Sequence, residues 1–138
     1  MSVLASKSFT EPEEVREFPH GHIDLVTVGD TMVGRAEFEP GWRWSQDVAP
    51  IAGTRSCQAA HTGYILSGRM HVVMDDGAEG EAGPGEAITV EPGHDAWVVG
   101  DEPAVILSPI SGSLIVREQT KVIAQNRELL AKTRAPNE

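Results

Sequence analysis

The sequence predicts an all-β fold, an antiparallel barrel of the jelly-roll type in a single domain. Between residues 57 and 110, runs of strand-like composition alternate with glycine-rich turns at a spacing of about ten residues. Within one run, Met70, Val72 and Met74 occupy alternate positions, which places them on the same face of a strand. The length of 138 residues suits one domain.

The N-terminal part is expected to form an arm, then a hairpin, then a loop. Residues 1–21 contain two prolines and several glutamates, which predicts an extended arm with little order. The strand-like runs 22–28 and 31–38 are joined by Gly29-Asp30, a connection of hairpin length. Residues 42–53 contain further breaking residues and are predicted to form a loop.

The remaining strands and one helix follow in order. The central strands are expected at residues 57–66, 69–74, 78–82, 86–90, 96–99 and 104–110. Residues 114–116 offer one further strand, so the barrel is expected to span residues 22–117. Helix-forming residues with grouped apolar positions predict a helix over 120–134, within a C-terminal segment 118–138.

Charge and composition exclude several classes of protein. The net charge is −10, and no Lys or Arg lies between Arg69 and Arg117, while nine acidic residues do. Nucleic-acid binding needs clustered basic side chains and is therefore not expected. No apolar run approaches the ~20 residues of a membrane span. The single cysteine, Cys57, cannot form an intramolecular disulfide, so a cytoplasmic protein is expected.

Two glycine-centred segments resemble the two-part signature of the cupin family. Residues 85–94 read Gly-Glu-Ala-Ile-Thr-Val-Glu-Pro-Gly-His, with both glycines of the second part at family spacing. The proline is displaced by one place, and the family's metal-binding histidine position falls on Ala96, while His94 lies two residues earlier. The resemblance implies a double-stranded β-helix, the jelly-roll barrel of that family.

The first part of the signature keeps its spacing but not its ligands. If Gly68 is its closing glycine, the family's glutamate position falls on His61, the second histidine on Cys57 and the first on Arg55. These three positions share strand parity and would face the barrel interior. The resemblance therefore implies a metal site at the family's position whose ligand residues differ from those of the family.

Two imidazoles and a thiolate form a chemically reasonable metal site. The candidate ligands are His61, His94 and Cys57, and nitrogen and sulfur donors favour zinc or iron over calcium or magnesium. Asp47 or Asp95 could complete the coordination. The alternative is that the cysteine is only packed in the core and that His94 only bonds the backbone.

Other side chains suggest roles in ligand binding and assembly. Trp44 could wall the mouth of the barrel over a small planar or carboxylate ligand, with Arg55 as an anion clamp. Trp97 is expected on the outer face, beneath the C-terminal helix or at a homodimer interface. His20 and His22 are expected to be solvated loop residues.

Two functional hypotheses remain open. The first is a small-molecule-binding cupin with a divalent transition metal in the barrel; if it is an enzyme, the family suggests oxygenase, isomerase or lyase chemistry on a small polar metabolite. The second is a metal-free ligand-binding or sensing module without catalysis. The convergence of three His, Cys or acidic side chains would favour the first, and a dry apolar interior the second.

Overall fold

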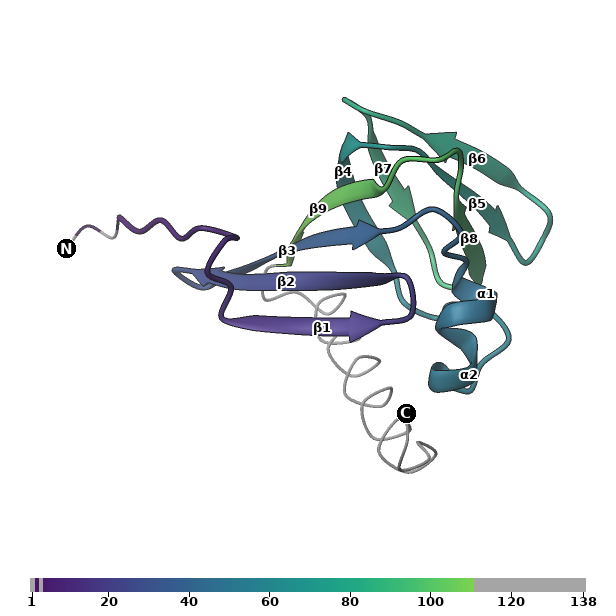
Figure 1. Cartoon of the computed structure of the whole chain (residues 1–138), viewed down its shortest axis with the longest axis horizontal. Coiled ribbons are helices and arrows are strands. Elements are labelled where there is room, and N and C mark those ends of the chain that lie inside the picture. The colour runs from purple at the N-terminus through teal and green to yellow at the C-terminus, as the bar shows by residue number, and fades with distance from the viewer. Residues whose placement is uncertain (1, 3, 111–138) are drawn as a thin grey trace.

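Two antiparallel β-sheets make up the protein (Figure 1). The computed structural model describes residue 2 and residues 4–110, and this part of the chain contains nine strands and two short helices. One sheet has six strands in the order β1-β2-β3-β9-β4-β7, and the other has three in the order β6-β5-β8. The all-β prediction is confirmed, whereas the helix expected over 120–134 and the strand at 114–116 lie outside the described residues.

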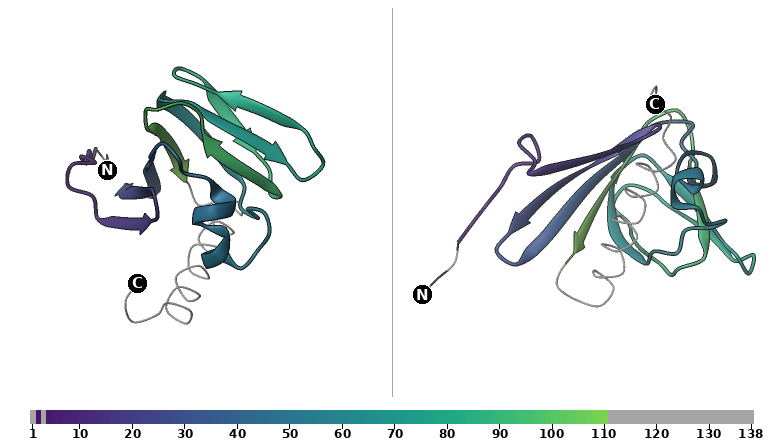
Figure 2. Two further views of the ribbon diagram at one scale, coloured as in Figure 1. Left: turned by 45° about the vertical axis from the view of Figure 1, so that its right-hand side comes forward. Right: turned by 90° about the horizontal axis from the view of Figure 1, so that it is seen from below.

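The N-terminal strands form one wing of the larger sheet. They are β1 (Glu14–Phe18), β2 (Gly21–Val28) and β3 (Thr31–Phe38). The views of Figure 2 show them on the opposite side of the molecule from β5 and β6. Gly29 has a φ of 64° in the tight turn between β2 and β3, a conformation that glycine adopts readily. The arm expected over residues 1–21 therefore includes a paired strand, because β1 lies in register along β2.

The larger sheet is completed by strands distant in sequence. These are β4 (His61–Ser67), β7 (Ala87–Val90) and β9 (Ala104–Ile110). At the end of β4, Gly68 has a φ of 75°, and a Cβ built there would lie 2.2 Å from the carbonyl oxygen of Pro103. Only glycine fits this close approach, which explains why the spacing around position 68 reads as a family signature.

The smaller sheet has two different edges. It consists of β5 (Met70–Met74), β6 (Glu79–Ala82) and β8 (His94–Val98). The outer side of β8 is covered by two isolated bridges, Arg43 with Trp97 and Cys57 with His94. No described strand pairs with the outer side of β6.

The expected loop 42–53 contains two short helices, α1 (Trp44–Asp47) and α2 (Ala49–Ala52). Asp47 is buried within α1 and accepts hydrogen bonds from the Arg43 amide, at 3.0 Å, and from His20 Nδ1. The bond from His20 ties α1 to the turn before β2, and Pro50 lies in the first turn of α2, where proline is tolerated. His20 is exposed in the turn between β1 and β2, as expected, and its ring is also bonded to α1. His22 was expected in a loop, but it lies on β2 and is only partly exposed.

The core lies between the two sheets. Trp42 and Trp44 are buried in it, and Phe38 contacts Trp42 with ring centroids 4.4 Å apart. Burial of these apolar groups is the main stabilising contribution expected for such a fold. No helix in the described part of the chain is both long and apolar enough to cross a membrane.

Trp97 lies on the outer face of the smaller sheet, as expected from its parity. Its ring is stacked on His71 at 4.6 Å, and the Arg43 guanidinium lies 4.4 Å from the ring centroid. These contacts shield the tryptophan without a partner chain. The homodimer stays a prediction.

Candidate metal centre

Cys57, His61 and His94 meet where the chain passes from one sheet to the other. The Cys57 amide donates to the His94 carbonyl at 2.7 Å, and the Gly93 amide donates to the Cys57 carbonyl at 2.6 Å, so Cys57 extends the smaller sheet. Four residues later, His61 begins β4 in the larger sheet. The three side chains therefore come from both sheets and converge between them.

The distances within this cluster are short. Cys57 Sγ lies 3.4 Å from His61 Nε2, and the rings of His61 and His94 meet edge to face with centroids 5.2 Å apart. The ligand atoms of the three residues all lie within 4.8 Å of one another. Cys57 and His94 are buried, whereas His61 is exposed along part of its surface. One side of the cluster is thus reachable from solvent.

The orientation of His94 is fixed by the backbone. Its Nδ1 lies 2.7 Å from the carbonyl oxygen of Glu91, and because a carbonyl only accepts, Nδ1 carries the hydrogen. The lone pair is then on Nε2, the nitrogen left for a ligand. Histidines that bind metals commonly donate their other N–H to a backbone carbonyl in this way.

Burial sets the protonation of all three groups. It raises the pKa of the Cys57 thiol to about 11, against a smaller opposite effect from the Ala59 amide. Desolvation of the ring lowers the pKa of His61 to about 4, and repulsion from the neighbouring His94 lowers it further in the same direction. Burial also lowers the pKa of His94, opposed by the Glu91 carbonyl and nearby carboxylates. At neutral pH the cluster holds two neutral imidazoles and a thiol.

This donor set can hold a metal ion. A tetrahedral zinc ion needs nitrogen and sulfur ligands separated by roughly 3.3–3.7 Å, given its bond lengths. The Cys57–His61 separation of 3.4 Å already meets this requirement. The other pairs lie within 4.8 Å, so they would need to close by about 1 Å at most, and the thiol must lose its proton on binding.

The two carboxylates considered as further ligands are occupied elsewhere. Asp95 accepts hydrogen bonds at 3.0 Å from Arg43 Nε and from the Ser45 amide. Asp47 is bonded to His20 and to the Arg43 backbone. Neither belongs to the cluster, which consists of the two histidines and the cysteine.

The two residues predicted to bind substrate lie in different surroundings. Trp44 is buried and belongs to the same core cluster as Cys57. Arg55 is exposed on the loop that leads to Cys57. The parity that we assumed for Arg55 and Cys57 requires a continuous strand, and β4 begins only at His61.

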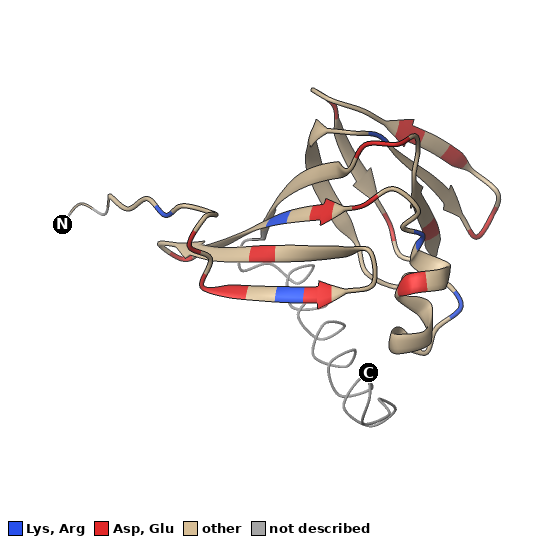
Figure 3. Cartoon of the chain, in the orientation of Figure 1, with Lys and Arg blue, Asp and Glu red and all other residues tan. Residues whose placement is uncertain are grey.

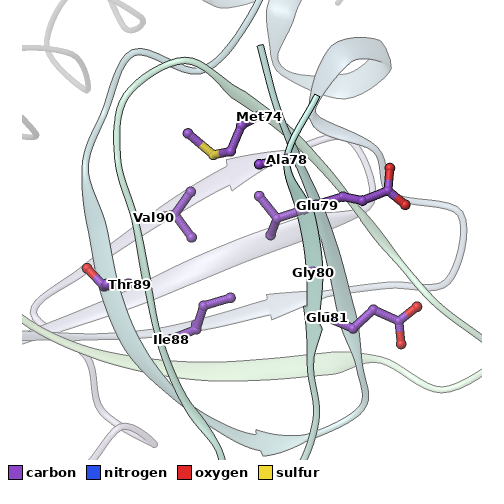
Figure 4. A pocket seen from close by; sticks show the side chains of 9 residues that line it. Met74, Ala78, Glu79, Gly80, Glu81, Ile88, Thr89 and Val90 are labelled. Carbon is purple, nitrogen blue, oxygen red and sulfur yellow. The ribbon is translucent and has the colours of Figure 1, made fainter. Parts of the chain in front are cut away.

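Sequence reasoning missed a cavity beside the cluster (Figure 4). Its volume is about 260 Å³, and its lining includes Val72, Met74, Ile88 and Val90. Two of these residues are strand partners of the histidines: Val90 lies opposite His61, and Met74 lies opposite His94. No local motif could have revealed it, because its walls come from strands of both sheets.

Comparison with known proteins gives the fold. No protein-family model matches the chain, and no curated protein sequence matches it. Among solved structures it is similar to an oxalate decarboxylase variant from Bacillus subtilis, with 17% identity over 83% of this chain and a TM-score of 0.56. The chain spans about a third of that protein, since the match covers 32% of it.

Two smaller proteins are similar over most of their own length. An RmlC-like cupin from Shewanella frigidimarina matches with 16% identity, 83% of this chain, 96% of that chain and a TM-score of 0.52. A cupin-2 domain from Rhodospirillum rubrum matches with 20% identity, 81% of this chain, 70% of that chain and a TM-score of 0.50. Identities this low establish architecture and not activity. The likeness, together with the two-sheet topology, confirms the predicted resemblance: this chain has the cupin fold.

Proposed function

We propose that this chain is a small-molecule-binding cupin that holds a divalent transition metal, zinc or iron, at Cys57, His61 and His94. The observation that carries the proposal is the convergence of three donor atoms from both sheets within 4.8 Å. The bond from His94 Nδ1 to Glu91 supports it, because it leaves Nε2 available as a ligand. Two neutral imidazoles are ready to coordinate, since histidine binds metals in its neutral form.

Three protein ligands would leave a position for water or a small molecule, which is the arrangement of catalytic rather than structural zinc sites. A metal in such a site acts as a Lewis acid on a bound oxygen or lowers the pKa of bound water. We extend the proposal to oxygenase, isomerase or lyase chemistry on a small polar metabolite. The open side of His61 and the adjoining cavity are the features that favour a bound molecule there.

The test is the metal content of protein purified without a histidine tag, measured by inductively coupled plasma mass spectrometry. We expect about one zinc or iron per chain, and a lower melting temperature after chelation, because binding stabilises only the folded state. At a free metal concentration 100 times the Kd this stabilisation is about 2.7 kcal/mol. His61→Ala should remove both the metal and the effect of the chelator.

The matched control is His22→Ala, since His22 lies on β2 and pairs with Asp24 at 3.7 Å, outside the cluster. It should bind metal and respond to chelation as the unmodified protein does. The proposal fails if the tag-free protein carries no stoichiometric metal and added zinc or iron leaves its melting curve unchanged.

One observation favours the second candidate, a metal-free ligand-binding module. At 3.4 Å, the Cys57 thiol can donate to His61 Nε2, so these two side chains satisfy each other without an ion. A thiol with a pKa of about 11 also keeps its proton in the absence of metal. This candidate predicts a protein that binds small molecules equally well before and after chelation.

A further inference from the structure

The cavity beside the metal cluster lies between two strand edges. β6 is an edge of the smaller sheet and β7 an edge of the larger one, and no described strand pairs them with each other. Figure 4 shows Ile88 and Val90 of β7 on one side of the cavity and β6 on the other. The inward-facing side chains that line it in the described part of the chain are hydrocarbon or thioether groups, including Val72 and Met74.

Gly80 creates part of this space. It lies opposite Val72 in the β5–β6 pairing, and residues directly opposite share a face of the sheet, so position 80 faces inward. A Cβ built on Gly80 would have no atom within 4 Å. Its φ lies outside the left-handed region, so a side chain would fit here without backbone strain. Any larger residue at position 80 would therefore project into the cavity.

The charged groups of β6 point away from the cavity. Figure 4 shows the carboxylates of Glu79 and Glu81 directed to the outer face. There Glu81 lies 3.1 Å from His71 Nδ1, and Glu79 lies 3.5 Å from His71 Nε2. Thr89 also points outward and bonds Thr62 at 2.9 Å. The acidic side chains near the cavity are thus paired with a histidine and do not enter it.

Among residue 2 and residues 4–110, no Lys or Arg lines the cavity. The sequence has no Lys or Arg between Arg69 and Arg117, and Figure 3 shows red acidic positions on β6, with most other strand positions uncharged. Arg69 itself faces Glu81 at 3.6 Å. An ionised ligand that entered the cavity would lose part of its hydration without gaining a charged partner among the described residues, which is unfavourable.

We infer that this cavity admits small uncharged molecules with an apolar part, and that it presents them to the metal cluster through Val90 and Met74. Both residues are strand partners of the cluster histidines, so a molecule held against them lies beside His61 and His94. A volume of about 260 Å³ accommodates a small molecule of about ten non-hydrogen atoms, since a cavity of about 150 Å³ already binds benzene. The inference rests on the proposed function only in assuming that a bound metal at the cluster is what reacts with the molecule.

The test compares n-butanol, butyrate and n-butylammonium, which differ in charge but little in size. Binding is followed by nuclear magnetic resonance shifts of the methyl groups of Met74, Ile88 and Val90, in metal-free and in zinc-titrated protein. Butanol should shift these signals saturably, with a Kd at least about tenfold lower than that of either ion. Equal affinity for butyrate, or no saturable shift with butanol, would overturn the inference.

Two variants locate the binding. Gly80→Leu should abolish the butanol shifts by filling the cavity, whereas Ala87→Leu, an exposed position on β7, should leave them unchanged. Unchanged binding in the Gly80→Leu protein would also overturn the inference. Zinc titration separates the two proposals: butanol binding without zinc binding contradicts the proposed function alone, and zinc binding without butanol binding contradicts the cavity alone.

Discussion

The two edges of the smaller sheet differ in how they are protected. The β8 edge is covered by the segments around Arg43 and Cys57, which form bridges to it and bring the metal cluster with them. The β6 edge carries Glu79 and Glu81 but has no described strand partner, and an apolar cavity lies behind it. Charged edge strands discourage pairing with other chains. The covered edge therefore holds the candidate chemistry, and the open edge provides access.

The largest effect is expected from the network that holds α1 on the β8 edge. Asp95 accepts hydrogen bonds from the Arg43 side chain and from the amides of Ser45 and Ala96. Asp95→Ala leaves the Ser45 amide without its partner, so we expect the free energy of unfolding to fall by about 1–3 kcal/mol. Urea denaturation measures this from the shift of the midpoint.

Asp101→Ala is the matched control, because Asp101 is exposed in the turn before β9. Surface substitutions of this kind usually change stability by less than about 0.5 kcal/mol. Equal effects of the two substitutions would show that Asp95 does not secure the covered edge.

An intermediate effect is expected from pH, and only at the covered edge. In metal-free protein the pKa of His61 is about 4, below its ordinary value of 6.5. As the pH falls below about 6.5 the unfolded chain takes up a proton that the folded chain does not, so stability is lost progressively toward pH 4. His61→Ala should reduce this dependence, as measured by urea denaturation across the range, while His22→Ala keeps it. A smaller slope should remain, because burial also lowers the pKa of His94. An unchanged slope in His61→Ala would assign the titration to other groups.

The smallest effect is expected at the open edge. Gly80→Ala should raise the free energy of unfolding by about 0.5 kcal/mol, because alanine loses less conformational freedom than glycine and meets no neighbour at this position. Gly77→Ala is the control: its Cβ would also lie in open space, but its φ of 94° disfavours a side chain. Thermal unfolding should separate the two, and destabilisation by Gly80→Ala would mean that the edge is more tightly packed than described.

The sequence predicted the strands where turn chemistry is strong. Gly68 and Gly93 lie at family spacing because both have a positive φ, which glycine adopts readily, and such requirements are local. β1 was missed because its strand conformation depends on hydrogen bonds to β2, and the polar and apolar residues of its own sequence do not predict a strand. The helices α1 and α2 were missed because each has only four residues, and tertiary contacts such as the one from His20 to Asp47 support α1.

The site was predicted in part for the same reason. Counting back from Gly68 selected His61 and Cys57, and the turn at Gly93 selected His94, so all three members of the cluster were named. The count could not show that Cys57 belongs to the smaller sheet and His61 to the larger. Because no single strand joins these residues, Arg55 does not share their inward-facing side, and it is exposed instead. The cavity depends on pairings between Val90 and His61 and between Met74 and His94, which are distant in sequence.

The passage of the chain between the sheets has a topological consequence. Four strands, β4 to β7, lie in sequence between His61 and His94. An ion bound by both histidines would close this stretch into a ring, and such closure restricts the unfolded chain much as a disulfide does. Strands paired on one side only, such as β6, would then unfold only together with the other strands enclosed by the ring. In the metal-loaded protein the amide hydrogens of β5 to β7 should exchange as one cooperative unit, at a rate that follows release of the ion.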